Sequence, residues 1–181
     1  SEAALSLQNV ANVLFFQGKY VEAEEAYEKV VRTLESLNSL GYDSINSLGR
    51  VKKCLGKFEG AVRLFRRALA MAEEDVGESN PKVAGCLASS GSALHHQHKN
   101  EEAEQHLSRA LIMQREAFGD THKDVERTLQ VLSHVVRSQG REGEADALSA
   151  EAARIQVDKV AEGSSTETAF ALFTKAVQMA S

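Results

Sequence analysis

Hydrophobic and polar positions follow one another along the chain with the 3.6-residue period of α-helices. Two apolar stripes with helical spacing are Ala23, Ala26, Tyr27, Val30 and Leu34 and, later in the chain, Ala61, Leu64, Phe65, Ala68, Leu69 and Ala72. Stripes of this kind predict eight helices that form four consecutive pairs. The first helices of the pairs are expected at residues 2–17, 43–55, 82–96 and 123–139. The second helices of the same pairs are expected at residues 22–37, 59–76, 101–116 and 142–159. The pattern therefore predicts an all-α protein built from helix pairs.

The helix pairs repeat along the chain. Four similar stretches are GKYVEAEEAY from Gly18, GKFEGAVRLF from Gly56, HKNEEAEQHL from His98 and GREGEADALS from Gly140. Their central alanines, Ala23, Ala61, Ala103 and Ala145, are 38, 42 and 42 residues apart. A second marker, GESNPKVA and then GDTHKDVE, recurs after 42 residues. Two markers in phase indicate a genuine internal repeat.

Each repeat has a glycine, or His98 in the third, between its two helices. We expect this residue to form a tight turn, because a positive φ costs glycine little. Small residues recur seven positions before the turn, at Ala11, Gly49, Gly91 and Ser133. Their size predicts a close approach of the paired helices.

These repeats resemble the tetratricopeptide repeat (TPR) family over about residues 3–160. The 42-residue spacing and the G-x-x-[HN]-[PK]-x-V marker are similar to those of the kinesin-light-chain and nephrocystin-type subgroup. The first repeat is four residues shorter, and Ser90, Asn100, Glu142 and Ser149 replace larger apolar or aromatic residues. The resemblance implies a right-handed α-solenoid within residues 1–162, with repeats at about 4–37, 42–76, 81–117 and 123–160.

The repeat pattern stops after Lys159. Ser164 and Glu167 have the spacing of a capping box, and an apolar face follows that includes Phe170, Phe173 and Val177. A solenoid must cover the open end of its last repeat, so residues 163–181 are expected to form a C-terminal capping helix. A helix that occupies the groove or binds a partner is the alternative.

Composition narrows the class of protein. The 181 residues are 43% hydrophobic and include one proline, which excludes wholesale disorder. The net charge of −5 gives no global basic field for nucleic acid. The apolar runs are far shorter than the roughly 20 residues of a membrane span, so we expect no membrane insertion by this fragment. The start at Ser1 indicates an excised fragment.

Cys54 and Cys86 are interpreted as free buried thiols of a reducing compartment. This favours an intracellular, cytoplasmic protein, or an organellar one if a targeting segment has been removed.

Motifs of catalysis and nucleotide binding are absent from the sequence, which contains no P-loop, G-x-G-x-x-G, G-x-S-x-G or H-E-x-x-H. We therefore expect no catalytic residues and no cofactor. His95 and His98 have an i,i+3 spacing that could share a metal, but a solvated helix end is the favoured interpretation.

Charge is divided unevenly between the two kinds of helix. The second helices hold 18 acidic and 9 basic residues, a net charge of −9, whereas the first helices have a net charge of +3. The family resemblance implies that the first helices line a concave groove. Its expected binding positions are Gln8, Asn12, Asn46, Arg50, Lys53, Ser92, His95, Arg127, Gln130, His134 and Arg137, and Phe15 and Ala88 lie at equivalent positions.

These residues predict a non-catalytic protein–protein interaction module, a scaffold or adaptor. Arg50, Lys53, Arg127 and Arg137 would bind an acidic peptide segment of another protein, and the amides would bind its backbone. An incidental scatter of four cations on a solvated surface is the competing interpretation. Two other functions stay open: a regulatory or accessory part of a larger enzyme, and a metal-binding scaffold that uses the histidines. The sequence leaves the oligomeric state open.

Overall fold

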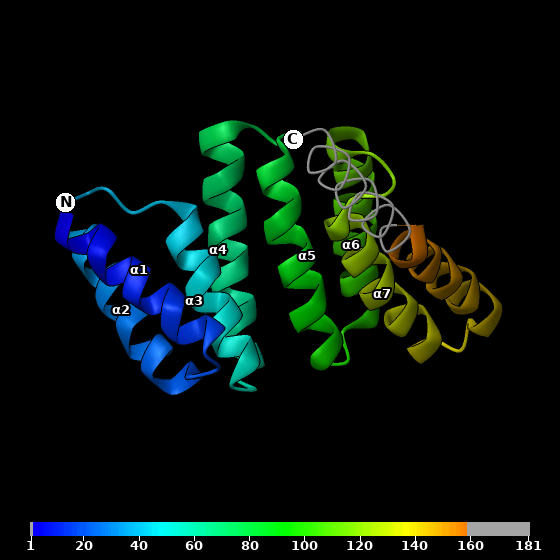
Figure 1. Ribbon diagram of the computed structural model, residues 1–181, viewed down its shortest axis with the longest axis horizontal. Helices are drawn as coiled ribbons and strands as arrows, with labels where there is room; N and C mark the ends of the chain where they lie inside the picture. Colours follow the sequence, from blue (N-terminus) through cyan, green and yellow to red (C-terminus); the bar gives the residue numbers. More distant parts are fainter. Residues whose placement is uncertain (1, 159–181) are drawn as a thin grey trace, which may run out of the picture. The chain divides into compact units, whose positions relative to one another are not determined.

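The computed structural model describes residues 2–158, which are helical apart from short connections (Figure 1). The helices are α1 (Glu2–Phe16), α2 (Tyr20–Ser36), α3 (Tyr42–Cys54), α4 (Phe58–Val76), α5 (Pro81–His96), α6 (Asn100–Phe118) and α7 (Lys123–Ser138), and residues 142–158 are also helical. The expected helix boundaries agree to within about two residues, and the all-α fold of repeated helix pairs is confirmed. The expected capping helix at 163–181 lies outside the described residues.

Left-handed residues form the turns within the helix pairs, as predicted. Gly18, Gly56 and Gly140 have φ angles of 75°, 72° and 82°. His98 takes the same role in the third repeat with a φ of 60°, a conformation that few residues other than glycine adopt. The amide of Lys57 donates to the carbonyl of Lys52 over 2.9 Å, the hydrogen bond that closes a Schellman-type helix end.

Small residues let the paired helices approach closely, again as predicted. A Cβ atom added to Gly49 would lie 2.6 Å from Cε1 of Phe65 on α4. One added to Gly91 would lie 2.6 Å from Cγ of Leu107 and 3.1 Å from the carbonyl oxygen of Ala103. Carbon atoms in contact are normally about 3.5–4.0 Å apart, so both positions require glycine for this packing.

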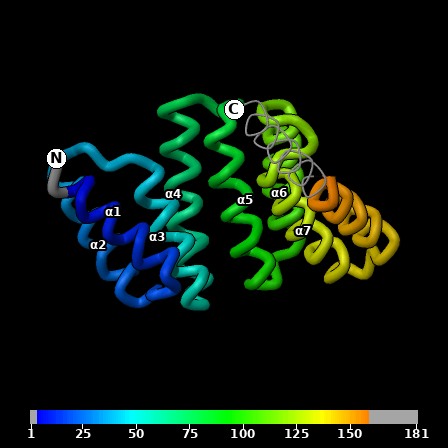
Figure 2. Tube along the Cα trace, viewed as in Figure 1, coloured from blue at the N-terminus to red at the C-terminus, as the bar shows by residue number. Residues whose placement is uncertain are grey.

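The chain divides into two compact units between Met113 and Gln114, within α6. In unit 1, α1 packs on α2, α2 on α3, α3 on α4 and α4 on α5, so the helices follow one another in chain order (Figure 2). Its core includes a cluster that contains Tyr27 and Val51 and a cluster that contains Ile45 and Leu87.

Unit 2 contains the end of α6, α7 and the helical residues 142–158. Val125, Leu129, Val136 and Ile155 are buried in it. The hydroxyl of Thr128 donates to Oε1 of Gln114 over 2.8 Å, so α7 is also linked to the end of α6 by a buried polar contact.

The two cysteines have different environments. Both are free thiols, and Cys86 is buried, but Cys54 is exposed. The interpretation of two buried thiols is therefore wrong for Cys54, which is exposed at the last residue of α3. Burial raises the pKa of the Cys86 thiol to about 11, and the negative charges of Asp43 and Glu73 act in the same direction.

Candidate peptide-binding surface

The expected binding positions of unit 1 lie on α1, α3 and α5, and hydrogen bonds connect these first helices side by side. The hydroxyl of Ser44 on α3 donates to Oε1 of Gln8 on α1 over 3.4 Å. Nζ of Lys53 on α3 donates to Oγ of Ser92 on α5 over 3.1 Å. The structure thus brings expected positions of neighbouring repeats together on one surface.

Arg50 contacts the aromatic ring of Phe15 on α1, and Asn12 contacts the buried Tyr27 of α2. Cζ of Arg50 lies 5.0 Å from the centroid of the Phe15 ring, which is a cation–π contact. No described carboxylate lies within ion-pair distance of Arg50. The hydroxyl of Tyr27 donates to Oδ1 of Asn12, and burial raises the pKa of that tyrosine.

Asn46 has a side-chain oxygen that is buried and accepts no hydrogen bond from the described residues. An unsatisfied buried acceptor is uncommon and costs free energy. This amide is therefore not locked by a local partner, unlike Asn12.

The histidines at the end of α5 make separate contacts. Nδ1 of His95 lies 3.0 Å from Oδ1 of Asn100, and the His96 ring stacks on Phe58 with ring centroids 4.6 Å apart. Burial lowers the pKa of His96, and the charges of His95 and Lys53 lower it further. Residues 2–158 contain no group of three or more His, Cys, Asp or Glu side chains arranged to hold a metal ion.

The remaining expected positions lie on α7 in unit 2. Arg137 forms ion pairs with Glu142 and Asp146 over 3.2 and 2.6 Å, and the hydrogen bond that it donates to Asp146 is the main cause of its raised pKa. Nε2 of Gln130 donates to Glu126 over 3.3 Å. Nη1 of Arg127 lies 3.9 Å from Oδ1 of Asp124, and 72% of the Arg127 side chain is exposed. His134 is exposed as well. The charge of Arg137 is thus compensated within its own repeat, whereas Arg127 is largely solvated.

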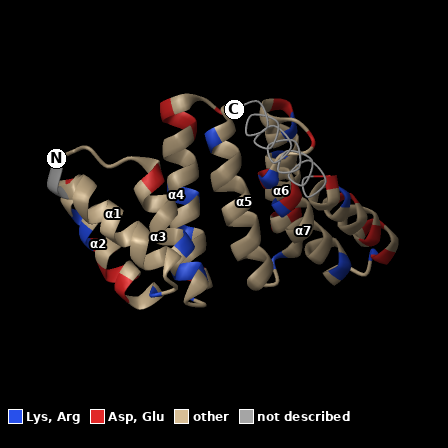
Figure 3. Cartoon of the chain, in the orientation of Figure 1, with Lys and Arg blue, Asp and Glu red and all other residues tan. Residues whose placement is uncertain are grey.

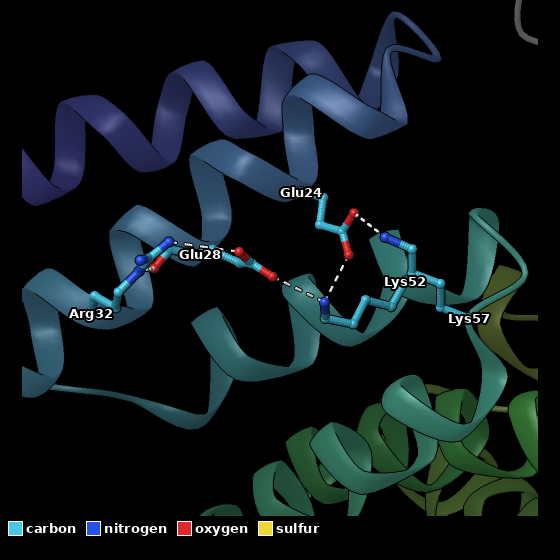
Figure 4. Close-up of polar contacts among 5 residues, drawn as sticks. All are labelled: Glu24, Glu28, Arg32, Lys52 and Lys57. Carbon is cyan, nitrogen blue, oxygen red and sulfur yellow. Dashed lines mark hydrogen bonds and ion pairs between the residues drawn. The ribbon is translucent and has the colours of Figure 1, made fainter.

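An ion cluster that sequence reasoning missed joins the first two repeats (Figure 4). Glu24 on α2 is 8% exposed and binds Lys52 Nζ at 2.7 Å and Lys57 Nζ at 2.6 Å. Lys52 also binds Glu28 at 3.0 Å. Burial acts to raise the pKa of Glu24, but the hydrogen bonds from Lys52 and Lys57 hold it below its usual value. The same carboxylates keep the pKa of Lys52 above its usual value, against the effect of burial.

This cluster changes the interpretation of the charge pattern. Lys52 belongs to a first helix, but its charge is directed to α2 and not to the expected groove. Further pairs connect successive second helices: Glu35 with Arg67 at 2.9 Å, Arg66 with Glu102, and Glu73 with Arg109 at 3.0 Å. Many charged side chains of the second helices therefore form ion pairs with the neighbouring repeat, whereas α1 and α5 carry few charges (Figure 3).

An open hollow beside α4 is another candidate binding site in unit 1. Phe58 and Leu64 form its apolar part, and the cations that line it are Lys52, Lys57, Arg63 and Arg67. Each of these cations pairs with a carboxylate of the same unit. Anion binding there would have to displace those carboxylates, so the hollow is a weaker candidate than the first-helix surface.

The family model for the tetratricopeptide repeat matches the chain twice, at residues 2–74 and 83–156. The chain belongs to this family, whose members are interaction modules and not a class of catalysts. No curated protein matches the sequence.

Solved structures with the same fold include kinesin-light-chain repeats. The nearly identical TPR-like repeats of a protein described as a kinesin light chain from Podosopora anserina are 19% identical, with a TM-score of 0.68 over 86% of this chain and 76% of that one. BtubC (BKLC) from P. vanneervenii is 17% identical, with a TM-score of 0.56 over 84% and 79%. MamA is 15% identical, with a TM-score of 0.64 over 87% and 80%. The likeness to kinesin-light-chain repeats is thus confirmed for the fold.

The described helices also bear on membrane insertion. None of those within residues 2–158 combines the length and the apolar character that a membrane crossing requires.

Proposed function

We propose that unit 1 binds an acidic peptide segment of a partner protein along α1, α3 and α5. The observation that carries this proposal is the placement of Arg50 and Lys53 on the surface that neighbouring first helices share. Arg50 rests on an aromatic ring, which fixes the guanidinium group without neutralising it. Nζ of Lys53 donates to Oγ of Ser92, which places this cation beside the next first helix.

The other expected positions of this surface complement the two cations. Gln8, Asn12, Asn46, Ser92 and His95 are uncharged side chains able to bond to a peptide backbone. Within unit 2, Arg127, Gln130 and His134 on α7 are proposed to bind a peptide by the same kinds of contact. Arg137 is the weaker participant, because an acidic ligand would compete there with Glu142 and Asp146.

Charge reversal at the two unit 1 cations tests the proposal. Each contact of a cation with a carboxylate contributes on the order of 0.5–3 kcal/mol, depending on desolvation. The double variant Arg50→Glu/Lys53→Glu should therefore weaken binding of an acidic peptide at least about tenfold. Binding by the unaltered protein should also fall as salt rises, because ions screen exposed charges beyond roughly 10 Å at 0.1 M.

A selection from random-sequence dodecamer peptides provides the probe without a known partner. The peptides selected by the full chain should be enriched in Asp and Glu, and their affinities should be measured for each variant. Arg32→Glu/Arg63→Glu is the matched control, because it makes the same change of charge at two second-helix side chains that are each 71% exposed. Selected peptides without acidic enrichment, or equal losses in the two double variants, would refute the proposal.

A further inference from the structure

One face of α1 is apolar and exposed. Val10 and Val13 are 53% and 54% exposed, and Ser6 beside them is exposed as well. Successive residues of a helix are 100° apart, so Val10 lies on the side of α1 opposite Gln8 and Asn12. This face is therefore distinct from the proposed peptide-binding surface.

The equivalent face is buried in the next two repeats. The repeats can be aligned at their turn residues, Gly18, Gly56 and His98. In this alignment the residues equivalent to Val10 and Val13 are Leu48 and Val51 in the second repeat and Ser90 and Ala93 in the third. Leu48 is 4% exposed, and the other three are each 0% exposed. Among the described repeats, the first is the one in which this face is exposed.

The structure shows what covers the face in unit 1. Tyr27 and Val31 of α2 pack in one cluster with Leu48 and Val51 of α3. In the next repeat α4 packs on α5, and Nδ1 of His106 on α6 also lies 3.0 Å from Oγ of Ser90. The second helix of the preceding repeat thus packs on this face of a first helix. The equivalent face of α1 is exposed and could accept such a helix.

The C-terminal segment contains a sequence of the second-helix type. Residues 166–180, TETAFALFTKAVQMA, align without gaps with residues 58–72, FEGAVRLFRRALAMA, of α4. The identical positions are Glu167, Ala169, Leu172, Phe173, Ala176, Met179 and Ala180. The tail has the A-x-x-x-F-x-x-A pattern of α4, and the other second helices share the first alanine of this pattern. The tail nevertheless follows residues 142–158, which are already a second helix.

The tail repeats the α4 residues that pack on α5. On α4, Ala68 and Ala72 belong to the cluster of Val83 and Leu87, and Leu64, Leu69 and Met71 lie against it. Their counterparts in the tail are Ala176, Ala180, Leu172, Val177 and Met179, all of them apolar. The tail therefore has the apolar residues that a cover for α1 needs.

We propose that residues 166–180 of one copy dock on the exposed face of α1 in a second copy, as the second helix of a preceding repeat would. Within unit 1, α1 lies at the opposite end of the helix series from α6, through which the chain continues into unit 2 (Figure 1). The proposed occupant is the tail of a second copy, and an increase in mass with concentration distinguishes this contact from docking within one copy. The contact joins two different surfaces, so it is heterologous, and repeating it gives head-to-tail assembly.

Complementation between two variants of the full chain tests this contact. The first variant, Val10→Gln/Val13→Gln, alters the face, and the second, Leu172→Gln/Val177→Gln, alters the tail. Because Val10 and Val13 are exposed, the first pair of substitutions should leave the helical circular-dichroism spectrum unchanged. Ile112→Gln, which replaces another apolar residue of similar exposure at 58%, is the control.

Sedimentation velocity under reducing conditions, from micromolar to hundreds of micromolar protein, gives the readout. The unaltered chain and the control should increase in mass with concentration, and each double variant alone should stay monomeric. An equimolar mixture of the two variants should form a dimer that grows no further, because only one intact face can meet one intact tail. An unaltered chain that stays monomeric, or a mixture without dimers, would overturn the proposal. Equal loss of association in the control would overturn it too.

Discussion

Replacing Gly49 with alanine tests the close packing of α3 on α4. The new methyl group would lie 2.6 Å from Cε1 and 2.9 Å from Cδ1 of the Phe65 ring, about 1 Å closer than carbon atoms pack. Phe65 is 0% exposed, so its ring has no free space into which it could turn. The two helices would have to move apart, or Phe65 would have to leave its rotamer.

The expected net effect combines two opposing contributions. Alanine is favoured over glycine within a helix by about 0.5–1 kcal/mol. Overpacking of a filled core costs about 1–3 kcal/mol. The variant should therefore lose about 0.5–2 kcal/mol of unfolding free energy, which corresponds to a decrease of a few degrees in melting temperature.

Gly85→Ala is the matched control, because Gly85 is also within a first helix and nothing lies within 4 Å of its added Cβ. This control should gain about 0.5–1 kcal/mol from helix propensity alone. Both variants should be compared with the unaltered chain by thermal and urea unfolding, monitored by circular dichroism. A Gly49→Ala variant at least as stable as Gly85→Ala would refute the packing argument.

Two further predictions concern the ion cluster and the thiols. Glu24→Gln should lower the free energy of unfolding at pH 7 by about 1–3 kcal/mol, a value between those of exposed and buried ion pairs. Glu25→Gln is the control, because Glu25 is at an exposed position of the same helix and its replacement should have little effect. Because the pKa of Glu24 is lowered, this contribution is present above its ordinary value of 4.5 and lost as pH falls through its native pKa, so urea unfolding should show the two chains converging in acid. A thiol reagent at pH 8 should modify Cys54 in the native protein and Cys86 only after unfolding, because Cys86 is buried with a pKa raised to about 11. Rapid native labelling of both would contradict the assigned burial.

Features that recur in every repeat could be predicted from the sequence. The alanines at the centre of the second helices and the residues at the turns fixed the boundaries of the helix pairs. The small residues Gly49 and Gly91 indicated close contacts that the structure contains. Repetition makes such features visible, because one local packing problem is solved several times.

Contacts that occur in one repeat alone were not predictable in the same way. Glu24 reaches Lys52 and Lys57, which are 28 and 33 residues away in the sequence. One signal was present, since the position of Lys52 is Leu14, Leu94 or Val136 in the other repeats. A lysine at a position that is otherwise apolar needs a partner, but the sequence does not say which carboxylate supplies it.

The assignment of Arg137 to a binding groove depended on repeat position alone. Its ion pairs with Glu142 and Asp146 form because the turn at Gly140 folds the next helix back beside α7. The wrong burial of Cys54 has a similar origin, since burial was assigned from residue type, whereas the last residue of α3 is exposed. In both cases the neighbouring helix decides the environment.

The ion cluster of Glu24 also distinguishes correct from incorrect neighbours. A chain of similar repeats can stack in the wrong order while it folds, because any second helix has an apolar stripe for any first helix. If α2 met α5 or α7 in place of α3, the position of Lys52 would hold Leu94 or Val136, and only the position of Lys57 would still hold a cation, Lys99 or Arg141. Glu24 would then be buried with one of its two ion pairs missing, which costs free energy. The cluster therefore favours the correct pairing of the first two repeats over an exchange of repeats of nearly the same shape during folding.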